Sequence, residues 1–198
     1  LAADGKSGVA VEVKCETDFV ARGDKFQGFV KDMVAQVAKG EYADSEALHS
    51  AAIVADASDS VKEALEGVIA TTGENMGLGK FAKMELAAGK SGLIGGYLHS
   101  NGKLAVLVEM QTGSDAAAAS EAFHEVAKNV AMQIAAMSPK YWDKSQVPQA
   151  DVDKELAVQV ALMDNDPKMA SKPAAVKEKI AAGKMAAFYK ESCLLQQE

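Results

Sequence analysis

Histidine and cysteine, the residue types most versatile in catalysis and metal binding, are few in this sequence and widely separated. The histidines are His49, His99 and His124, and the cysteines are Cys15 and Cys193. A zinc protease motif needs a second histidine four residues after the first, but Lys128 occupies that position after His124. No catalytic or metal-binding constellation is indicated. The sequence therefore predicts a protein that is not an enzyme and that holds no metal or cofactor.

Two glycine-rich stretches do not match the motifs that bind nucleotides. In residues 73–80 the spacing differs from that of a phosphate-binding loop, and Phe81 follows Lys80 where Ser or Thr is needed. Residues 92–96 lie within a strand pattern and do not open a helix, as a dinucleotide-binding loop must. We therefore expect that this chain binds no nucleotide itself.

Charge and hydropathy limit the classes of partner. The net charge of −7 and the pI near 5.1 argue against broad nucleic-acid binding, because affinity for the phosphate backbone comes mainly from Lys and Arg. No apolar run approaches the roughly 20 residues that span a bilayer. Two cysteines far apart fit a reducing compartment better than a disulfide-linked secreted domain. We expect a soluble protein that contacts neither nucleic acid nor membrane directly.

Hydrophobic periodicity indicates the elements that position these residues. The alternation of Val9, Val11 and Val13 is typical of a half-buried strand, and similar patterns predict strands at 78–86, 92–98 and 104–110. The turn signal between the last two lies at 100–102. Apolar residues spaced by three and four predict helices at 26–40, 45–57, 60–70 and 115–137. Ser60 and Glu63 have the spacing of a capping box at the start of the third helix.

An internal repeat organises the chain. An ungapped offset of 97 residues aligns a strand, a linker and a helix near the N-terminus with a second set near the middle. Identical pairs include Gly5 and Gly102, Lys6 and Lys103, Val11 and Val108, Asp18 and Asp115, and Phe26 and Phe123. Hydrophobic character is also kept at most other positions. We therefore expect the strand and the helix to bury the same face in both copies.

These patterns predict an α+β fold with two similar subdomains, each a small antiparallel sheet with covering helices, followed by a helical hairpin. The expected boundaries are 1–90, 91–148 and 149–198. In the hairpin, one stripe holds Val152, Leu156, Val160 and Met163, and the second helix, 173–190, carries Val176, Ile180, Met185 and Phe188. The stripe of the second helix is narrow and suffices only for its partner helix. We therefore expect a protruding antiparallel coiled coil.

The linker between strand and helix differs between the copies. It begins Thr17, Asp18, Phe19, Val20 in the first copy and Ser114, Asp115, Ala116, Ala117 in the second. Both aspartates stand at a helix entry, where a carboxylate can satisfy free N–H groups and the helix dipole. Phe19 has no aromatic counterpart. Either it packs on something particular to the first subdomain or it is exposed to meet a partner, and the residues alone leave both alternatives open.

The segment 16–21, Glu-Thr-Asp-Phe-Val-Ala directly after a valine-rich strand, resembles the signature of the elongation factor Ts family. The resemblance continues through residues 72–76, 96–99, 103–108 and 126–139 and the hairpin from 151 to 190, which together cover nearly the whole chain. It also implies that the family's N-terminal helical module is missing before Leu1 and that the extreme C-terminus is cut short. Functions of those parts are not expected of this chain.

The resemblance implies a function. Members of this family are guanine-nucleotide exchange factors for the GTPase elongation factor Tu. They act in the bacterial cytoplasm or in an organelle matrix or stroma. By residue matching, Asp18 and Phe19 would enter the GTPase near its Mg²⁺ site, with Thr17 and Val20 holding the loop, and GDP would leave once Mg²⁺ is disturbed. His99 matches a family histidine that also contacts the GTPase.

One alternative of another class is a non-catalytic α+β scaffold. In that interpretation the helical hairpin binds the partner and Phe19 belongs to the core. The exposure of Phe19 in the folded chain separates the two hypotheses.

Overall fold

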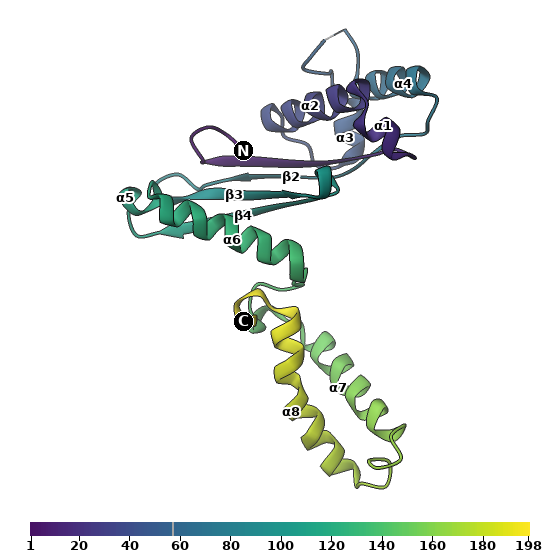
Figure 1. The fold of residues 1–198 in the computed structure, drawn as a ribbon, viewed down its shortest axis with the longest axis vertical. Coiled ribbons are helices and arrows are strands. Elements are labelled where there is room, and N and C mark those ends of the chain that lie inside the picture. The colour runs from purple at the N-terminus through teal and green to yellow at the C-terminus, as the bar shows by residue number, and fades with distance from the viewer. Residues whose placement is uncertain (57) are drawn as a thin grey trace. The chain divides into compact units, whose positions relative to one another are not determined.

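The valine alternation near the N-terminus forms strand β1 (Ser7–Lys14), which pairs antiparallel with β2 (Gly77–Glu85). Strands β3 (Ser91–His99) and β4 (Leu104–Thr112) form a second antiparallel pair around the short helix η1 (Ser100–Gly102). The computed structural model describes residues 1–56 and 58–198 (Figure 1). Two small antiparallel sheets combined with helices confirm the predicted α+β fold.

The chain divides into two units, Leu1–Met132 and Gln133–Glu198. Both sheets belong to the first unit, and α6 continues into the second. The helices of the first unit are α1 (Asp18–Arg22), α2 (Asp24–Lys39), α3 (Ser45–Ser50), α4 (Val61–Thr72), α5 (Asp115–Ala118) and most of α6 (Glu121–Met137). The predicted boundaries at residues 90 and 148 stay predictions.

Two helix predictions need correction. The helix expected over 45–57 ends at Ser50, because Ala51 adopts an extended conformation and Ala52 pairs with Ser60 in an isolated bridge. Ala57 lies outside the described residues. The helix expected over 115–137 is interrupted after α5, because Ser120 turns the chain and its Oγ accepts a hydrogen bond from Phe123 N at 3.3 Å, which starts α6.

The repeat is visible in the structure. Strand β4 begins 97 residues after β1, and α5 and α6 begin 97 residues after α1 and α2. Each copy therefore consists of a strand, a helix of one turn and a long helix. The copies differ in chain order, since β1 pairs with a later strand and β4 with an earlier one.

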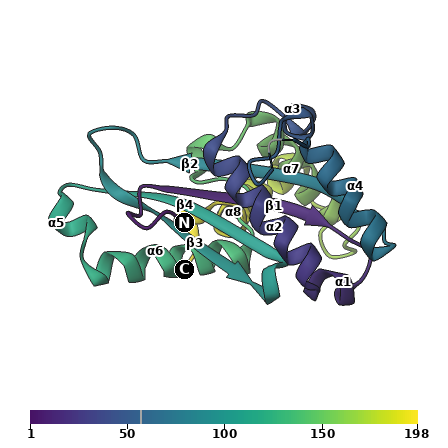
Figure 2. The ribbon, with the colours of Figure 1, turned by 90° about the horizontal axis from the view of Figure 1, so that it is seen from above.

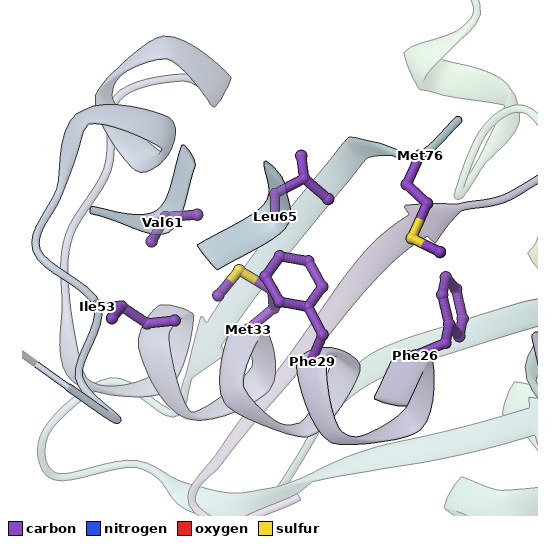
Figure 3. Packing of buried hydrophobic residues seen from close by; sticks show 7 residues of the cluster. All are labelled: Phe26, Phe29, Met33, Ile53, Val61, Leu65 and Met76. Atoms are coloured by element: carbon purple, nitrogen blue, oxygen red, sulfur yellow. The ribbon is translucent and has the colours of Figure 1, made fainter. Parts of the chain in front are cut away.

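The first copy has a core of large side chains between α2, α4 and the strands. Figure 3 shows its members, Phe26, Phe29, Met33, Ile53, Val61, Leu65 and Met76. Figures 1 and 2 show α2 lying along β1, with α4 beside it. The larger α2 side chains fill the space that these elements enclose.

The buried face of the long helix is rotated in the second copy, so the prediction that the helix buries the same face in both copies holds only in part: Phe123, Val130 and Ile134 are half-buried. Val126, the equivalent of the buried Phe29, is 49% exposed, whereas Ala127 and Ala131 are almost fully buried. The reason is close packing: a Cβ added to Gly95 of β3 would lie 3.1 Å from the Ala127 Cβ. Only small residues allow a helix backbone to approach a strand so closely.

The second unit contains a pair of helices, α7 (Gln149–Asp164) and α8 (Ala174–Ser192), flanked by η2 (Lys144–Gln146) and η3 (Leu194–Gln196). Figure 1 shows α7 and α8 running antiparallel and side by side. The coiled coil stays a prediction. Val176 is 41% exposed, because Lys177 takes the inward position and donates to the Ala170 carbonyl at 2.8 Å. Among the described residues, no helix is both long and apolar enough to cross a bilayer.

Candidate functional site

The most exposed large hydrophobic side chain of the chain's described part is Phe19, with 91% of its surface accessible. It lies on α1, the five-residue helix that joins β1 to α2. The structure therefore contradicts the alternative in which Phe19 packs in the core. An exposed aromatic ring on a surface turn contributes no burial free energy to the fold of the free chain. We therefore take this turn as the candidate site.

Helix α1 is too short to be stable alone, since isolated helices below about 12 residues are marginal in water. Its inner face supplies one support, because Val20 and Ala21 pack against the core cluster. The side chain of Gln27 supplies another, donating to the Ala21 carbonyl at 2.6 Å. With Val20 and Ala21 held inward, the turn presents Asp18 and Phe19 outward.

Thr17, and not Asp18, is the N-cap of α1. The Thr17 Oγ1 accepts a hydrogen bond from Val20 N at 3.3 Å, and in the second copy Ser114 Oγ accepts from Ala117 N at 3.2 Å. Asp18 and Asp115 occupy the first helical position instead. The prediction that these aspartates are the caps is wrong in that respect, although each carboxylate still lies at the positive end of a short helix.

Glu74 binds the start of α1 across a long sequence separation. Its Oε2 accepts hydrogen bonds from Glu16 N at 3.2 Å and Thr17 N at 2.9 Å, and its Oε1 accepts from Thr17 Oγ1 at 2.5 Å. These three bonds tie the end of β1 and the cap of α1 to the segment between α4 and β2. The turn is thus fixed at its N-terminal side by one carboxylate.

Asp18 interacts with two cations. Its Oδ1 lies 3.0 Å from Lys103 Nζ and its Oδ2 lies 3.8 Å from Arg22 Nη2. The hydrogen bond from Lys103, the charge of Lys103 and the charge of Arg22 together lower the pKa of Asp18 below its ordinary value. Because both groups are largely exposed, the ion pair orients the carboxylate more than it stabilises the fold.

His99 lies at the end of β3 and is exposed. Its Nδ1 is 2.8 Å from Tyr97 Oη on the same strand. Lys103 follows the η1 turn of this hairpin, so the ion pair with Asp18 brings the hairpin end toward α1, as both Figures 1 and 2 show. The four predicted residues of the first linker thus share one turn, and His99 belongs to the hairpin that reaches it.

Sequence reasoning missed Glu74, Lys103 and Arg22 as parts of the site. Glu74 stands 57 residues from Thr17, so no local pattern indicates the contact. Arg22 is four residues after Asp18, a spacing that predicts a helical ion pair once α1 is recognised. The repeat offered a signal for α1 itself, since it aligns Gly23 with Ser120, where both copies break between a short and a long helix.

The site has few groups that could make or break a covalent bond. Burial raises the pKa of the Cys15 thiol, and the negative charges of Glu74 and Asp18 raise it further, so this cysteine is a poor nucleophile at neutral pH. Within residues 1–56 and 58–198, no group of three His, Cys, Asp or Glu side chains is arranged to hold a metal ion. What the turn offers is an exposed ring beside a carboxylate, an arrangement suited to contact with another macromolecule.

Comparison with known proteins assigns this arrangement to a family. Residues 16–198 match the family model described as Elongation factor TS. The chain is 43% identical to a protein named elongation factor Ts from Nitratidesulfovibrio vulgaris (strain DP4), with 100% of this chain and 62% of that protein covered. A relative of the same name from Lawsonia intracellularis is also 43% identical, over 96% of this chain and 63% of the relative. A third, from Clostridium novyi, is 36% identical, over 100% and 61%. The chain thus spans about three fifths of the length of these curated relatives.

Proposed function

Because the chain belongs to the elongation factor Ts family, we propose that it is a guanine-nucleotide exchange factor that binds elongation factor Tu·GDP and promotes GDP release. Exchange of this kind supports translation elongation. No bond of the nucleotide is made or broken, so the chain acts without being an enzyme. The proposed place of action is the cytoplasm of a bacterium, since the relatives described above are bacterial.

The observation that carries the proposal is the exposure of Phe19 on a turn whose inner side packs against the rest of the first unit. A ring that is 91% exposed can be buried by a partner. The contacts that support α1 hold its backbone in place before any partner binds, which limits the conformational entropy lost on binding. The equivalent residue of the second copy is Ala116, so the aromatic ring serves the first copy alone.

In the proposed mechanism, Phe19 inserts between helices of the GTPase near its Mg²⁺ site. Asp18 disturbs the contacts that keep Mg²⁺ on the β-phosphate, and Thr17 and Val20 hold the turn that presents both residues. His99, on the hairpin that Lys103 links to Asp18, makes a further contact with the GTPase. GDP loses its bridging cation and dissociates.

Magnitudes show that Phe19 cannot act alone. A thousandfold faster release requires about 4 kcal/mol of differential stabilisation. Burial of one phenylalanine side chain contributes roughly 1.5–3 kcal/mol. The remainder must come from a broader surface, and the second copy and the helical hairpin are the parts of the chain that remain to supply it. The turn would then displace the cation while the other surfaces supply affinity.

A factor of this kind must prefer the nucleotide-free GTPase. A ligand shifts an equilibrium only by its differential affinity for the two states. The complex with empty elongation factor Tu must therefore be tighter than the complex with the GDP-bound form, and GDP must weaken it in turn.

The test uses this chain and purified elongation factor Tu. Stopped-flow fluorescence follows the release of a fluorescent GDP analogue with increasing amounts of the chain, and a pull-down compares binding with and without excess GDP. We expect faster release and a complex that excess GDP dissociates. Release at the intrinsic rate at every concentration would contradict the proposal. The scaffold alternative predicts binding that GDP does not change.

A further inference from the structure

We propose that Glu74 is a positioning residue for nucleotide exchange, acting through Thr17 to hold Asp18 and Phe19 in their outward orientation. This inference rests on the proposed function and adds to it a residue that lies outside the four-residue linker. Glu74 need not touch the partner. Its role follows from the contacts that it makes within the first unit.

Glu74 makes three hydrogen bonds, all at the start of α1. Glu74 accepts from two successive backbone N–H groups, at Glu16 and Thr17, and from the Thr17 hydroxyl. Hydrogen bonds to a charged acceptor are stronger than neutral ones. The carboxylate therefore fixes the backbone position and the side-chain rotamer of Thr17 together, immediately before the two residues proposed to act on the partner.

The Thr17 hydroxyl is oriented by its bond to Glu74. A threonine hydroxyl has one proton to donate and lone pairs to accept with. Donation to Glu74 Oε1 leaves the lone pairs of Thr17 Oγ1 for Val20 N, which donates to it at 3.3 Å. Both bonds can therefore form at once, so Glu74 and Val20 N hold the Thr17 side chain in one rotamer while it caps the helical turn of residues 18–22.

Glu74 lies between two anchored positions of the backbone. It follows Gly73, which ends α4 in the left-handed conformation with φ of +73° and donates its N–H to the Ile69 carbonyl at 2.8 Å. Two residues later, Met76 is buried in the core cluster beside Phe26 (Figure 3). The backbone on both sides of Glu74 is therefore anchored, so the carboxylate can act as a fixed support.

The second copy provides the contrast. Its cap, Ser114, accepts from Ala117 N as Thr17 accepts from Val20 N. Within the described part of the chain, however, no carboxylate accepts a hydrogen bond from Ser114. A cap alone therefore suffices to form the short helix, and the additional carboxylate accompanies the copy that displays an exposed phenylalanine. That association is what indicates positioning rather than folding as its role.

The experiment measures exchange at a range of factor concentrations for the wild-type chain and for Glu74→Gln and Glu74→Ala. Glu63→Gln is the matched control, because Glu63 also accepts from a backbone N–H and a hydroxyl, at Ser60, but at the start of α4. Amide hydrogen exchange of Glu16 and Thr17 in the free chain gives a readout that does not depend on the partner.

We expect Glu74→Ala to lower the maximal rate of GDP release about tenfold, with little change in the half-saturating concentration, because the other surfaces still bind. Glu74→Gln keeps one acceptor oxygen and should lose about threefold. Both variants should exchange the Glu16 and Thr17 amides faster. Glu63→Gln should leave all these quantities unchanged. If Glu74→Ala does not fold, Glu74→Gln decides the question.

A double mutant separates positioning from general destabilisation. In a Phe19→Ala background, Glu74→Gln should slow release less than it does in the wild-type chain, because one of the two residues that Glu74 positions is gone. Additive slowing, or wild-type rates in both Glu74 variants, would overturn the inference while leaving the proposed function intact. Absence of any acceleration by the wild-type chain would overturn both.

Discussion

In the first copy of the repeated module, α2 buries Phe29 and Met33 under α4, whereas in the second copy α6 leaves the equivalent Val126 half exposed and buries Ala127 and Ala131. The strands and both helices begin at equivalent positions in the two copies. The difference lies in what covers the long helix. A copy with its own large core can support a turn whose exposed ring, Phe19, contributes nothing to folding.

The second copy contributes a different surface feature, the end of its β-hairpin. Its strand pair extends to the hairpin end that holds His99 and Lys103, and Lys103 reaches across to Asp18 of the first copy. One copy therefore presents the exposed ring, and the other supplies the cation that orients the neighbouring carboxylate. The duplicated module has thus kept the start positions of its elements while its two surfaces have diverged.

The largest expected effect comes from the core that distinguishes the copies. Met33→Ala removes a fully buried side chain and should reduce the free energy of unfolding by about 2–5 kcal/mol. Val130→Ala, at the equivalent position of α6, removes a half-buried side chain and should cost about 1 kcal/mol or less. Urea denaturation measures both. Equal losses would show that the two helices are equally important to the fold.

The next effect concerns exchange. Phe19→Ala should slow GDP release from elongation factor Tu roughly ten- to a hundredfold, because it removes about 1.5–3 kcal/mol of burial that exists only with the partner. Its melting temperature should remain that of the wild type, since the ring is 91% exposed. The reciprocal change, Ala116→Phe, should alter neither rate nor stability. Stopped-flow release and calorimetry check these outcomes, and a destabilised Phe19→Ala chain would return the ring to the core.

A smaller effect is expected at the two caps. Thr17→Ala and Ser114→Ala each remove a helix cap and should each cost about 1 kcal/mol of stability. Only Thr17→Ala should also slow exchange, because only Thr17 holds the turn with Phe19. Thr17→Ser, which keeps the hydroxyl, should recover most of the rate. Slowing by Ser114→Ala as well would indicate that the caps act through general stability.

The smallest effect is electrostatic. Lys103→Met should raise the pKa of Asp18 toward its ordinary value, as measured by carboxyl NMR titration, whereas Lys6→Met at the equivalent position should not. The lowered pKa of Asp18 contributes stability that is present above the ordinary carboxyl pKa and lost as pH falls through the lowered value. Lys103→Met should therefore lower the free energy of unfolding slightly at neutral pH. It should also reduce the decrease of that free energy on acidification. An unchanged Asp18 titration would show that the ion pair does not form in solution.

Much of the fold was predictable because it depends on local patterns. Valine alternation located β1, the spacing of Ser60 and Glu63 located the capping box of α4, and the repeat located the second module. The rotated face of α6 was not predictable, because it depends on Gly95 of another element approaching Ala127. Thr17 and Glu74 illustrate the same limit at the candidate site, since packing across 57 residues brings them together.

The left-handed Gly73 has a consequence for how such a sequence can vary over generations. A residue with a Cβ is strained at φ of +73°, so substitution here would shift Glu74, and through it the turn that carries Phe19. In related sequences, Gly73, Glu74 and Thr17 should therefore be substituted together or all be retained, although none of them need touch the proposed GTPase partner. If the proposed function holds, mutations that abolish it in a growth screen should accordingly include a cluster at 73–74, far along the chain from the residues proposed to meet the partner.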